Sequence, residues 1–316
     1  MIGIDIKRAA TLLREGQVVA IPTETVYGLA GNALSENAVA TIFAVKNRPY
    51  FDPLIIHTND FQRVGEWVEN IPDQARYLAE ALLPGPLTFL LPKKPIIPDL
   101  VTAGSSLVAI RIPQHPFSQA LLAQLDFPLA APSANPFGYI SPTNAQHVEQ
   151  QLGDQIPYIL DGGPCQVGVE STIIGFPDGR PVVYRKGGIA IETIEQLIGP
   201  LEVKEHSASN PQAPGMLKSH YAPRVPLILG EIEQMLPLHQ AKRLGILSFQ
   251  KRFPNIPSAQ QIILSPSGDF REAAQHLFSG LRHLDNLDLD IILAELLPEK
   301  DLGRAINDRL RRAAQR

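Results

Sequence analysis

The stretch that decides the fold is Val18-Val19-Ala20-Ile21-Pro22-Thr23-Glu24-Thr25-Val26-Tyr27-Gly28. Its first four residues are apolar, which is typical of a buried strand, and Pro22 ends the strand because proline has no N–H for the ladder. Two threonines, a glutamate and a tyrosine follow at once. In an open α/β sheet, ligands bind outside the carboxyl ends of the strands. These polar side chains are therefore predicted to face a ligand crevice.

A helix and two basic residues complete this stretch. Ser35 is a candidate N-cap, and the apolar residues that follow it up to Val45 recur at helical spacing. The helix is predicted to end at Lys46-Asn47-Arg48-Pro49, because a proline disfavours helical geometry in the residue before it. A lysine and an arginine thus lie near the predicted crevice.

Two further strands carry ionisable side chains. Leu54–His57 ends in a histidine, which at a strand end is more often a structural hydrogen-bonding group than a catalytic one. Leu107–Ile112 alternates so that Arg111 lies on the face opposite Val108 and Ile110. A buried arginine needs an anion, so either a structural salt bridge or a bound ligand explains Arg111.

Hydroxyl, amide and basic groups recur at the ends of the remaining N-terminal strands. They fall in Ser133-Ala134-Asn135 after the strand 128–131, at Ser171 and Thr172 within the strand 169–174, and at Arg185 in the strand 182–187. Ser141-Pro142-Thr143 predicts an N-cap followed by proline at the first helical position, opening a helix through Leu152.

Composition narrows the class of protein. The chain has 316 residues, of which 44% are hydrophobic, enough for two domains, and its net charge of -4 does not indicate wholesale wrapping of nucleic acid. Cys165 is the single cysteine, and no His/Cys cluster suggests zinc, so we expect neither a disulfide nor a metal site. The N-terminus has charges throughout and no long apolar run, which predicts a cytoplasmic protein without a membrane span.

The amino-acid composition of the sequence changes after residue 199. The segment 199–226 is rich in proline and contains Ala213–Pro223, which has no clear periodicity, so we predict a linker that lies over the crevice. Beyond Leu227, strands and helices alternate, which predicts a small doubly wound α/β domain. The last helix carries five arginines, from Arg304 to Arg316, and a solvated face explains them better than an RNA patch does.

The chemistry suggested by these groups is polyanion binding. The chain has no Walker A sequence, no Gly-x-Ser-x-Gly elbow and no defensible Ser/His/Asp constellation. Arginine binds phosphate or carboxylate through two parallel hydrogen bonds, lysine adds a point charge, and hydroxyl groups fix orientation. A site without a nucleophile works by alignment and charge neutralisation, as phosphoryl and nucleotidyl transfer allow.

An ordered set of motifs resembles the threonylcarbamoyl-adenylate synthase family. The set comprises PTETVYGLAGNA at 22–33, KNRP at 46–49, TAG at 102–104, SAN at 133–135, GVEST at 168–172 and HYAP at 220–223. The resemblance implies a YrdC-like catalytic domain with a twisted mixed sheet over residues 1–200. A proline-rich linker over the active site, 201–226, and a smaller Rossmann-like α/β domain, 227–316, would follow.

The resemblance also implies an activity. The family condenses L-threonine, bicarbonate and ATP, with Mg²⁺, to threonylcarbamoyl-AMP and pyrophosphate. A separate transferase places the threonylcarbamoyl group on an adenosine of tRNA, so the expected partners are small-molecule substrates and that downstream machinery. Weak direct binding of tRNA is a further expectation.

The family's site residues carry over by position. The threonine side would comprise Thr25, His57, Arg111, Ser171 and Thr172. The ATP side would comprise Lys46, Arg48, Asp52, Ser133, Asn135, Ser141, Arg185 and Tyr221, with Lys46 and Arg48 as the catalytic cations. Asp52 stands where relatives often have asparagine, so a metal or water contact is an alternative to an ATP contact. Ser219 stands where many relatives have lysine, and Lys218 is its nearest substitute.

Two rival functions stay open at this stage. A YrdC-like domain presents a concave basic surface, so the chain could be an RNA-binding or regulatory module without adenylate-forming activity. Carbamoyl transfer of the hydrogenase-maturation type uses the same domain in larger chains, but this sequence lacks the cysteines and the additional segment of those chains.

Overall fold

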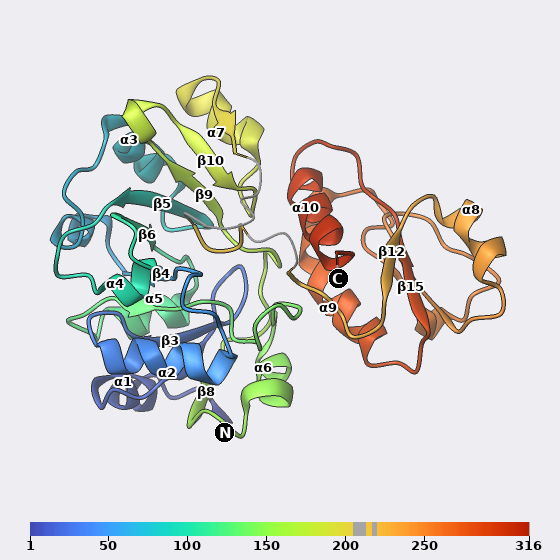
Figure 1. Ribbon diagram of the computed structural model, residues 1–316, viewed down its shortest axis with the longest axis horizontal. Coiled ribbons are helices and arrows are strands. Elements are labelled where there is room, and N and C mark those ends of the chain that lie inside the picture. The colour runs from blue at the N-terminus through green and yellow to red at the C-terminus, as the bar shows by residue number, and fades with distance from the viewer. Residues whose placement is uncertain (205–212, 217–219, 316) are drawn as a thin grey trace.

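The computed structural model describes residues 1–204, 213–216 and 220–315 and contains two β-sheets. Figure 1 shows a larger N-terminal lobe and a smaller C-terminal lobe, with helices of the small lobe facing the large one. Within the described residues, no helix is long and apolar enough to cross a membrane.

The larger sheet has eleven strands in the order β1-β8-β2-β3-β7-β4-β6-β5-β9-β10-β11. The strands are β1 (Ile2–Gly3), β2 (Val19–Ile21), β3 (Gly28–Asn32), β4 (Ile55–His57), β5 (Leu87–Pro92), β6 (Leu107–Arg111), β7 (Leu129–Ala130), β8 (Tyr158–Leu160), β9 (Thr172–Gly175), β10 (Val182–Arg185) and β11 (Glu202–Val203). Parallel and antiparallel pairs are mixed, since β4 and β6 run parallel whereas β5 and β6 run antiparallel.

Seven helices of the large lobe cover this sheet within the described residues. They are α1 (Ile6–Arg14), α2 (Glu36–Lys46), α3 (Asp73–Leu82), α4 (Asp99–Thr102), α5 (Pro116–Leu122), α6 (Ala145–Leu152) and α7 (Ile191–Ile198). The alternation in β2 separates two cores, because Val19 and Ile21 pack with α1 and α5 whereas Ala20 packs with α2, α3 and α6.

Local sequence explains the boundaries of α2. The Ser35 hydroxyl accepts a hydrogen bond from the backbone N–H of Ala38, as the sequence predicts, and Asn47 ends the helix in the left-handed region at φ 50°. The prediction that a helix opens at Ser141–Thr143 is wrong. Instead, the Asn144 side chain caps α6 by accepting from His147 N, and Ser141 is left to bond elsewhere.

The small lobe is the predicted α/β domain. Its parallel sheet has the order β12-β15-β13-β14, formed by β12 (Leu227–Leu229), β13 (Leu244–Ser248), β14 (Gln261–Ile263) and β15 (Ile291–Ala294). The helices are α8 (Ile232–Met235), α9 (Phe270–Asp285) and α10 (Gly303–Ala313). Figure 1 shows α9 and α10 on the side of this sheet that faces the large lobe.

The two lobes share a continuous apolar core. Val26, Ile140 and Val169 of the large lobe pack in one cluster with residues of α9 and α10. Gly168 approaches α9 so closely that a Cβ there would lie 2.4 Å from the carbonyl oxygen of Ala274. The lobes are therefore joined by apolar packing that includes a close approach of Gly168 to the backbone of α9.

The prediction of a solvated basic face on the last helix holds for Arg304 and Arg311 but is wrong for Arg309 and Arg312, and Arg316 lies outside the described residues. Arg309 is fully buried and Arg312 is 1% exposed, because both point into the joint between the lobes. Arg311 and Arg304, by contrast, are the partly exposed members of the helix and pair with Glu299 and Glu192.

Candidate active site

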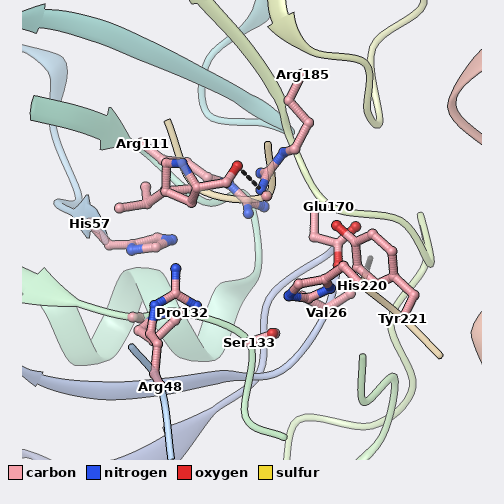
Figure 2. A pocket seen from close by; sticks show the side chains of 14 residues that line it. Val26, Arg48, His57, Arg111, Pro132, Ser133, Glu170, Arg185, His220 and Tyr221 are labelled. Carbon is pink, nitrogen blue, oxygen red and sulfur yellow. Dashed lines mark hydrogen bonds between the residues drawn. The ribbon is translucent and has the colours of Figure 1, made fainter. Parts of the chain in front are cut away.

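A cavity in the large lobe collects the basic side chains that the sequence singled out. The cavity itself has a volume of about 50 Å³ and opens to solvent. Its lining residues are Val26, Arg48, Ile55, His57, Arg111, Ala131, Pro132, Ser133, Glu170, Arg185, Pro214, Gly215, His220 and Tyr221. Figure 2 shows Arg48, Arg111 and Arg185 approaching this space from three different directions. The three guanidinium groups therefore share one cavity.

Strand register explains why distant residues meet here. His57 and Arg111 are paired neighbours on β4 and β6, and Thr88 on β5 pairs with the same arginine. Leu87 in turn pairs with Thr172 on β9. Three adjacent strands thus place His57, Arg111 and Thr88 in one row, whereas Thr172 on the fourth strand lies one position out of that row.

Arg111 forms the salt bridge that was one of its two interpretations, and its binding of a ligand remains a prediction. Its guanidinium donates to the Glu24 carboxylate at 2.7 Å, and it also lines the cavity. Glu24 accepts a second hydrogen bond, from the backbone N–H of Gln114 at 3.0 Å. Glu24 was expected to face the crevice, but it is not among the residues that line the cavity and reaches it only through Arg111.

His57 is a neutral group beside that arginine. Burial, reinforced by the charge of Arg111, lowers the pKa of His57 to about 3. Its Nδ1 atom has no hydrogen-bond partner among the described residues. The imidazole can therefore exchange hydrogen bonds with a small ligand without adding charge.

Arg48 is held in place by Asp52. The guanidinium lies 2.9 Å from the Asp52 carboxylate and also donates to the carbonyl oxygens of Asp52 and Pro53. Burial raises the pKa of Asp52, although nearby Arg48 lowers it. Asp52 is fully buried and is not among the residues lining the cavity, so in this structure it contacts the arginine.

Lys46 fixes the loop that follows β7. Its Nζ donates to the carbonyl oxygens of Ser133 and Asn135, both at 2.5 Å, and the side chain is 1% exposed. Burial first, and then the charge of Arg48, hold the pKa of Lys46 well below its usual range. Ser133 lines the cavity, whereas the Asn135 amide donates to the carbonyl oxygens of Pro136 and Tyr139.

The predicted threonine-side hydroxyl groups lie next to the cavity rather than on its wall. Ser171 is within 2.6 Å of the Thr88 hydroxyl and accepts from Arg185 at 3.1 Å. Thr172 donates to the carbonyl oxygen of Ile189, and Thr25 is 2.9 Å from the Thr23 hydroxyl. The ligand-binding roles of Thr25, Ser171 and Thr172 remain predictions.

Among the described residues, Glu170 is the carboxylate on the cavity wall, and no sequence pattern had singled it out. The Ser141 hydroxyl donates to it at 2.6 Å, and Arg309 donates to its other oxygen at 3.0 Å. No local signal reveals the second contact, because the arginine lies 139 positions later in another domain.

The linker lies against the cavity. Pro214, Gly215, His220 and Tyr221 line it, and Arg185 donates to the carbonyl oxygen of Pro214 at 3.2 Å. Figure 2 shows the rings of His220 and Tyr221 side by side below Glu170. Lys218 and Ser219, whose role the sequence analysis questioned, lie outside the described residues.

The charges in and around the cavity favour an anion. Six cations gather there: Lys46, Arg48, Arg111, Arg185, Arg309 and Arg312. The buried carboxylates beside them are Glu24, Asp52, Glu170 and Asp308. On the cavity wall itself Arg48, Arg111 and Arg185 face Glu170, and such buried arginines favour an anionic ligand.

The described residues contain no group of three or more His, Cys, Asp or Glu side chains that could hold a metal ion. The carboxylate on the cavity wall, Glu170, already engages a hydroxyl and an arginine.

Comparison with known proteins identifies the family. A family model described as telomere recombination, of the Sua5, YciO and YrdC type, matches residues 11–187. A second model, described as the C-terminal domain of threonylcarbamoyl-AMP synthase, matches residues 189–315. The chain belongs to the threonylcarbamoyl-AMP synthase family.

Relatives match along nearly the whole chain. The threonylcarbamoyl-AMP synthase of Pyrococcus abyssi is 40% identical over 98% of this chain and 94% of its own length. That of Bacillus subtilis is 41% identical over 98% and 92%. The crystal structure of P. abyssi Sua5 complexed with L-threonine matches with a TM-score of 0.92, at 40% identity and the same coverage of 98% and 94%. The predicted two-domain α/β fold is confirmed.

Proposed function

We propose that the protein condenses L-threonine, bicarbonate and ATP to threonylcarbamoyl-AMP and pyrophosphate. The observation that carries the proposal is the convergence of Arg48, Arg111 and Arg185 on one cavity that has no nucleophilic side chain placed for covalent catalysis among its lining residues. Such a site suits a reaction in which the substrates supply the nucleophile and the leaving group. The similarity to a structure that holds L-threonine supports the amino acid as a substrate.

Arg111 and His57 form the proposed threonine side. Arg111 would bind the carboxylate of the amino acid through the face that Glu24 leaves free, and neutral His57 would bond to its polar groups. Thr25, Ser171 and Thr172 would support this side from behind the wall, since their hydroxyl groups bond to neighbouring protein atoms.

Arg48, Ser133, Arg185 and Tyr221 form the proposed ATP side on the cavity wall. Lys46, Asn135, Ser141 and Asp52 would act one layer behind: Lys46 fixes the loop that carries Ser133, and Asp52 orients Arg48. In this arrangement Asp52 contacts ATP only through the arginine.

The chemistry balances without an enzyme-bound intermediate. The amine of threonine takes up bicarbonate as a carbamate, with loss of water. A carbamate oxygen then attacks the α-phosphorus of ATP, and the bond to the β-phosphate breaks as pyrophosphate leaves with its electron pair. Arg48 on the cavity wall, supported by Lys46 in the layer behind it, would disperse the charge that develops on the phosphates, and Mg²⁺ would neutralise part of that charge.

We assign this reaction to residues 1–200, with the linker 201–226 over the site and the small domain 227–316 beside it. The protein would work in the cytoplasm. An acyl-adenylate is activated for transfer, so this product would pass to a transferase that modifies tRNA. The tRNA would contact this protein only weakly.

The decisive experiment is incubation with labelled threonine, bicarbonate and Mg-ATP, followed by detection of a labile threonine-AMP adduct. Formation of the adduct that requires all three substrates supports the enzyme. Salt-sensitive binding of RNA that is indifferent to threonine and bicarbonate, without adduct, would instead support an RNA-binding module.

A further inference from the structure

Two arginines of the small domain reach the ATP side of the cavity. Arg282 of α9 donates to the carbonyl oxygens of Ile140 and Ser141. Arg309 of α10 donates to the Glu170 carboxylate, whose other oxygen accepts the Ser141 hydroxyl. The small domain therefore fixes Ser141 twice. Arg282 holds its backbone carbonyl directly, and Arg309 holds its side chain through Glu170.

Arg309 is built into this position. It is fully buried, its Nη1 atom donates to the Lys186 carbonyl oxygen at 2.8 Å and to Asp308 at 2.8 Å, and its guanidinium lies 5.3 Å from the ring centre of Tyr221. A guanidinium presents its donors in one rigid plane, so these contacts fix its orientation toward Glu170.

We propose that Arg309 is a positioning residue of the ATP subsite, which keeps Glu170 ionised and oriented to accept the Ser141 hydroxyl. The inference rests on the proposed function. Arg309 itself is not among the residues that line the cavity, so it acts through Glu170. A domain outside the catalytic fold would thereby determine the charge of a group on the cavity wall.

The charges around Glu170 make this dependence specific to Arg309. Burial raises the pKa of Glu170, but Arg309, then Arg185, then the hydrogen bond from Ser141 lower it, and the net pKa lies below its usual value. Asp308, Arg312, His220 and the Tyr221 hydroxyl are further ionisable groups close to this pair. Without Arg309, the largest of the groups that lower the pKa of Glu170 is lost, so we expect that pKa to rise.

The test is the pH dependence of adenylate formation in full-length Arg309→Gln. The wild type is expected to show no Glu170 titration between about pH 5.5 and 8, whereas in the variant Glu170 should take up a proton as the pH falls through its raised pKa. Activity of the variant should then drop toward acid pH, with KM for ATP raised roughly 10- to 100-fold and KM for threonine little changed.

Three companion variants isolate the cause. Glu170→Gln cannot titrate, so the double variant Arg309→Gln/Glu170→Gln should lose the acid slope of the single variant. Arg309→Lys should keep the charge and the flat profile while KM for ATP stays raised, and it also carries the test if Arg309→Gln does not fold. Arg311→Gln, on the exposed side of the same helix, should match the wild type throughout.

Other results would overturn the inference. They are a profile of Arg309→Gln parallel to the wild type, an acid slope that survives in the double variant, or equal increases in KM for both substrates, as a purely structural role would give. Absence of adduct with the wild type would reject the proposed function instead. Calorimetric titration with ATP at acid and neutral pH would then test Arg309 by itself. If the ratio of the ATP affinities of Arg309→Gln and the wild type is the same at both pH values, the inference is wrong.

Discussion

At the scale of single residues, the site is a set of buried charges that constrain one another. Arg111 illustrates the consequence, because it pairs with Glu24 while also lining the cavity. Removing one member of a buried pair costs about 3–5 kcal/mol by stranding the other, so loss of activity in a single variant cannot be read as loss of a ligand contact.

We expect Arg111→Ala to lower the free energy of unfolding by several kcal/mol, roughly 3–5, and to abolish threonine binding. The double variant Arg111→Ala/Glu24→Gln should regain most of the stability, since no unpaired charge stays buried, yet should still fail to bind threonine. Urea unfolding and calorimetric titration with threonine measure the two effects separately. Restored binding in the double variant would remove Arg111 from the substrate site.

His57 gives a prediction about pH. Because burial and Arg111 lower its pKa to about 3, the imidazole should stay neutral from pH 8 to pH 5, and its NMR signals should not shift there. In the unfolded chain the group titrates near its ordinary value, so its contribution to stability is present above about pH 6.5 and is lost as the pH falls toward 3. A His57 titration midpoint near 6.5 in the folded protein would contradict this.

At the scale of elements, local signals located most strands and helices that carry the site. The alternation around Arg111 and the cap at Ser35 were both predictable, because neighbours in sequence determine them. The misplaced start of α6 has a simple cause: Ser141 has the chemistry of a cap, but its hydroxyl bonds to Glu170 instead. A contact between residues far apart in sequence overrode a local preference there.

Variants of the α2 cap residue, Ser35, should change the stability of the fold without changing ATP binding. Ser35→Ala should lower the free energy of unfolding by about 1 kcal/mol, because it leaves the N–H of Ala38 without its side-chain acceptor. Ser35→Asp, which keeps an acceptor at the positive end of the helix, should cost little. KM for ATP should not change in either variant, since Arg48 is fixed at the far end by Asp52. Steady-state kinetics and thermal unfolding provide the comparison.

At the scale of the whole molecule, the sequence indicated two domains but not how they depend on each other. The sequence pattern predicted that Arg309 and Arg312 lie on a solvated face. Several of their partners lie in another domain or in the linker, and the periodicity of a helix does not indicate such contacts. The same holds for Glu170, whose surroundings are assembled from β10, the linker and α10. Charge complementarity across the joint became visible only with the fold.

Gly168 makes that joint testable. It has φ 78° and touches α9, so a methyl group at this position meets the Ala274 carbonyl oxygen and Gln275 Cα at 2.4 Å and must push the lobes apart. Gly179→Ala is the matched control, because Gly179 has φ 74° but nothing within 4 Å of the added Cβ. Both variants share the cost of a left-handed alanine, about 1 kcal/mol. Gly168→Ala should lose several times more stability, unfold in two transitions by calorimetry, and form adenylate more slowly. Equal behaviour of the two variants would mean that the small domain does not need this contact.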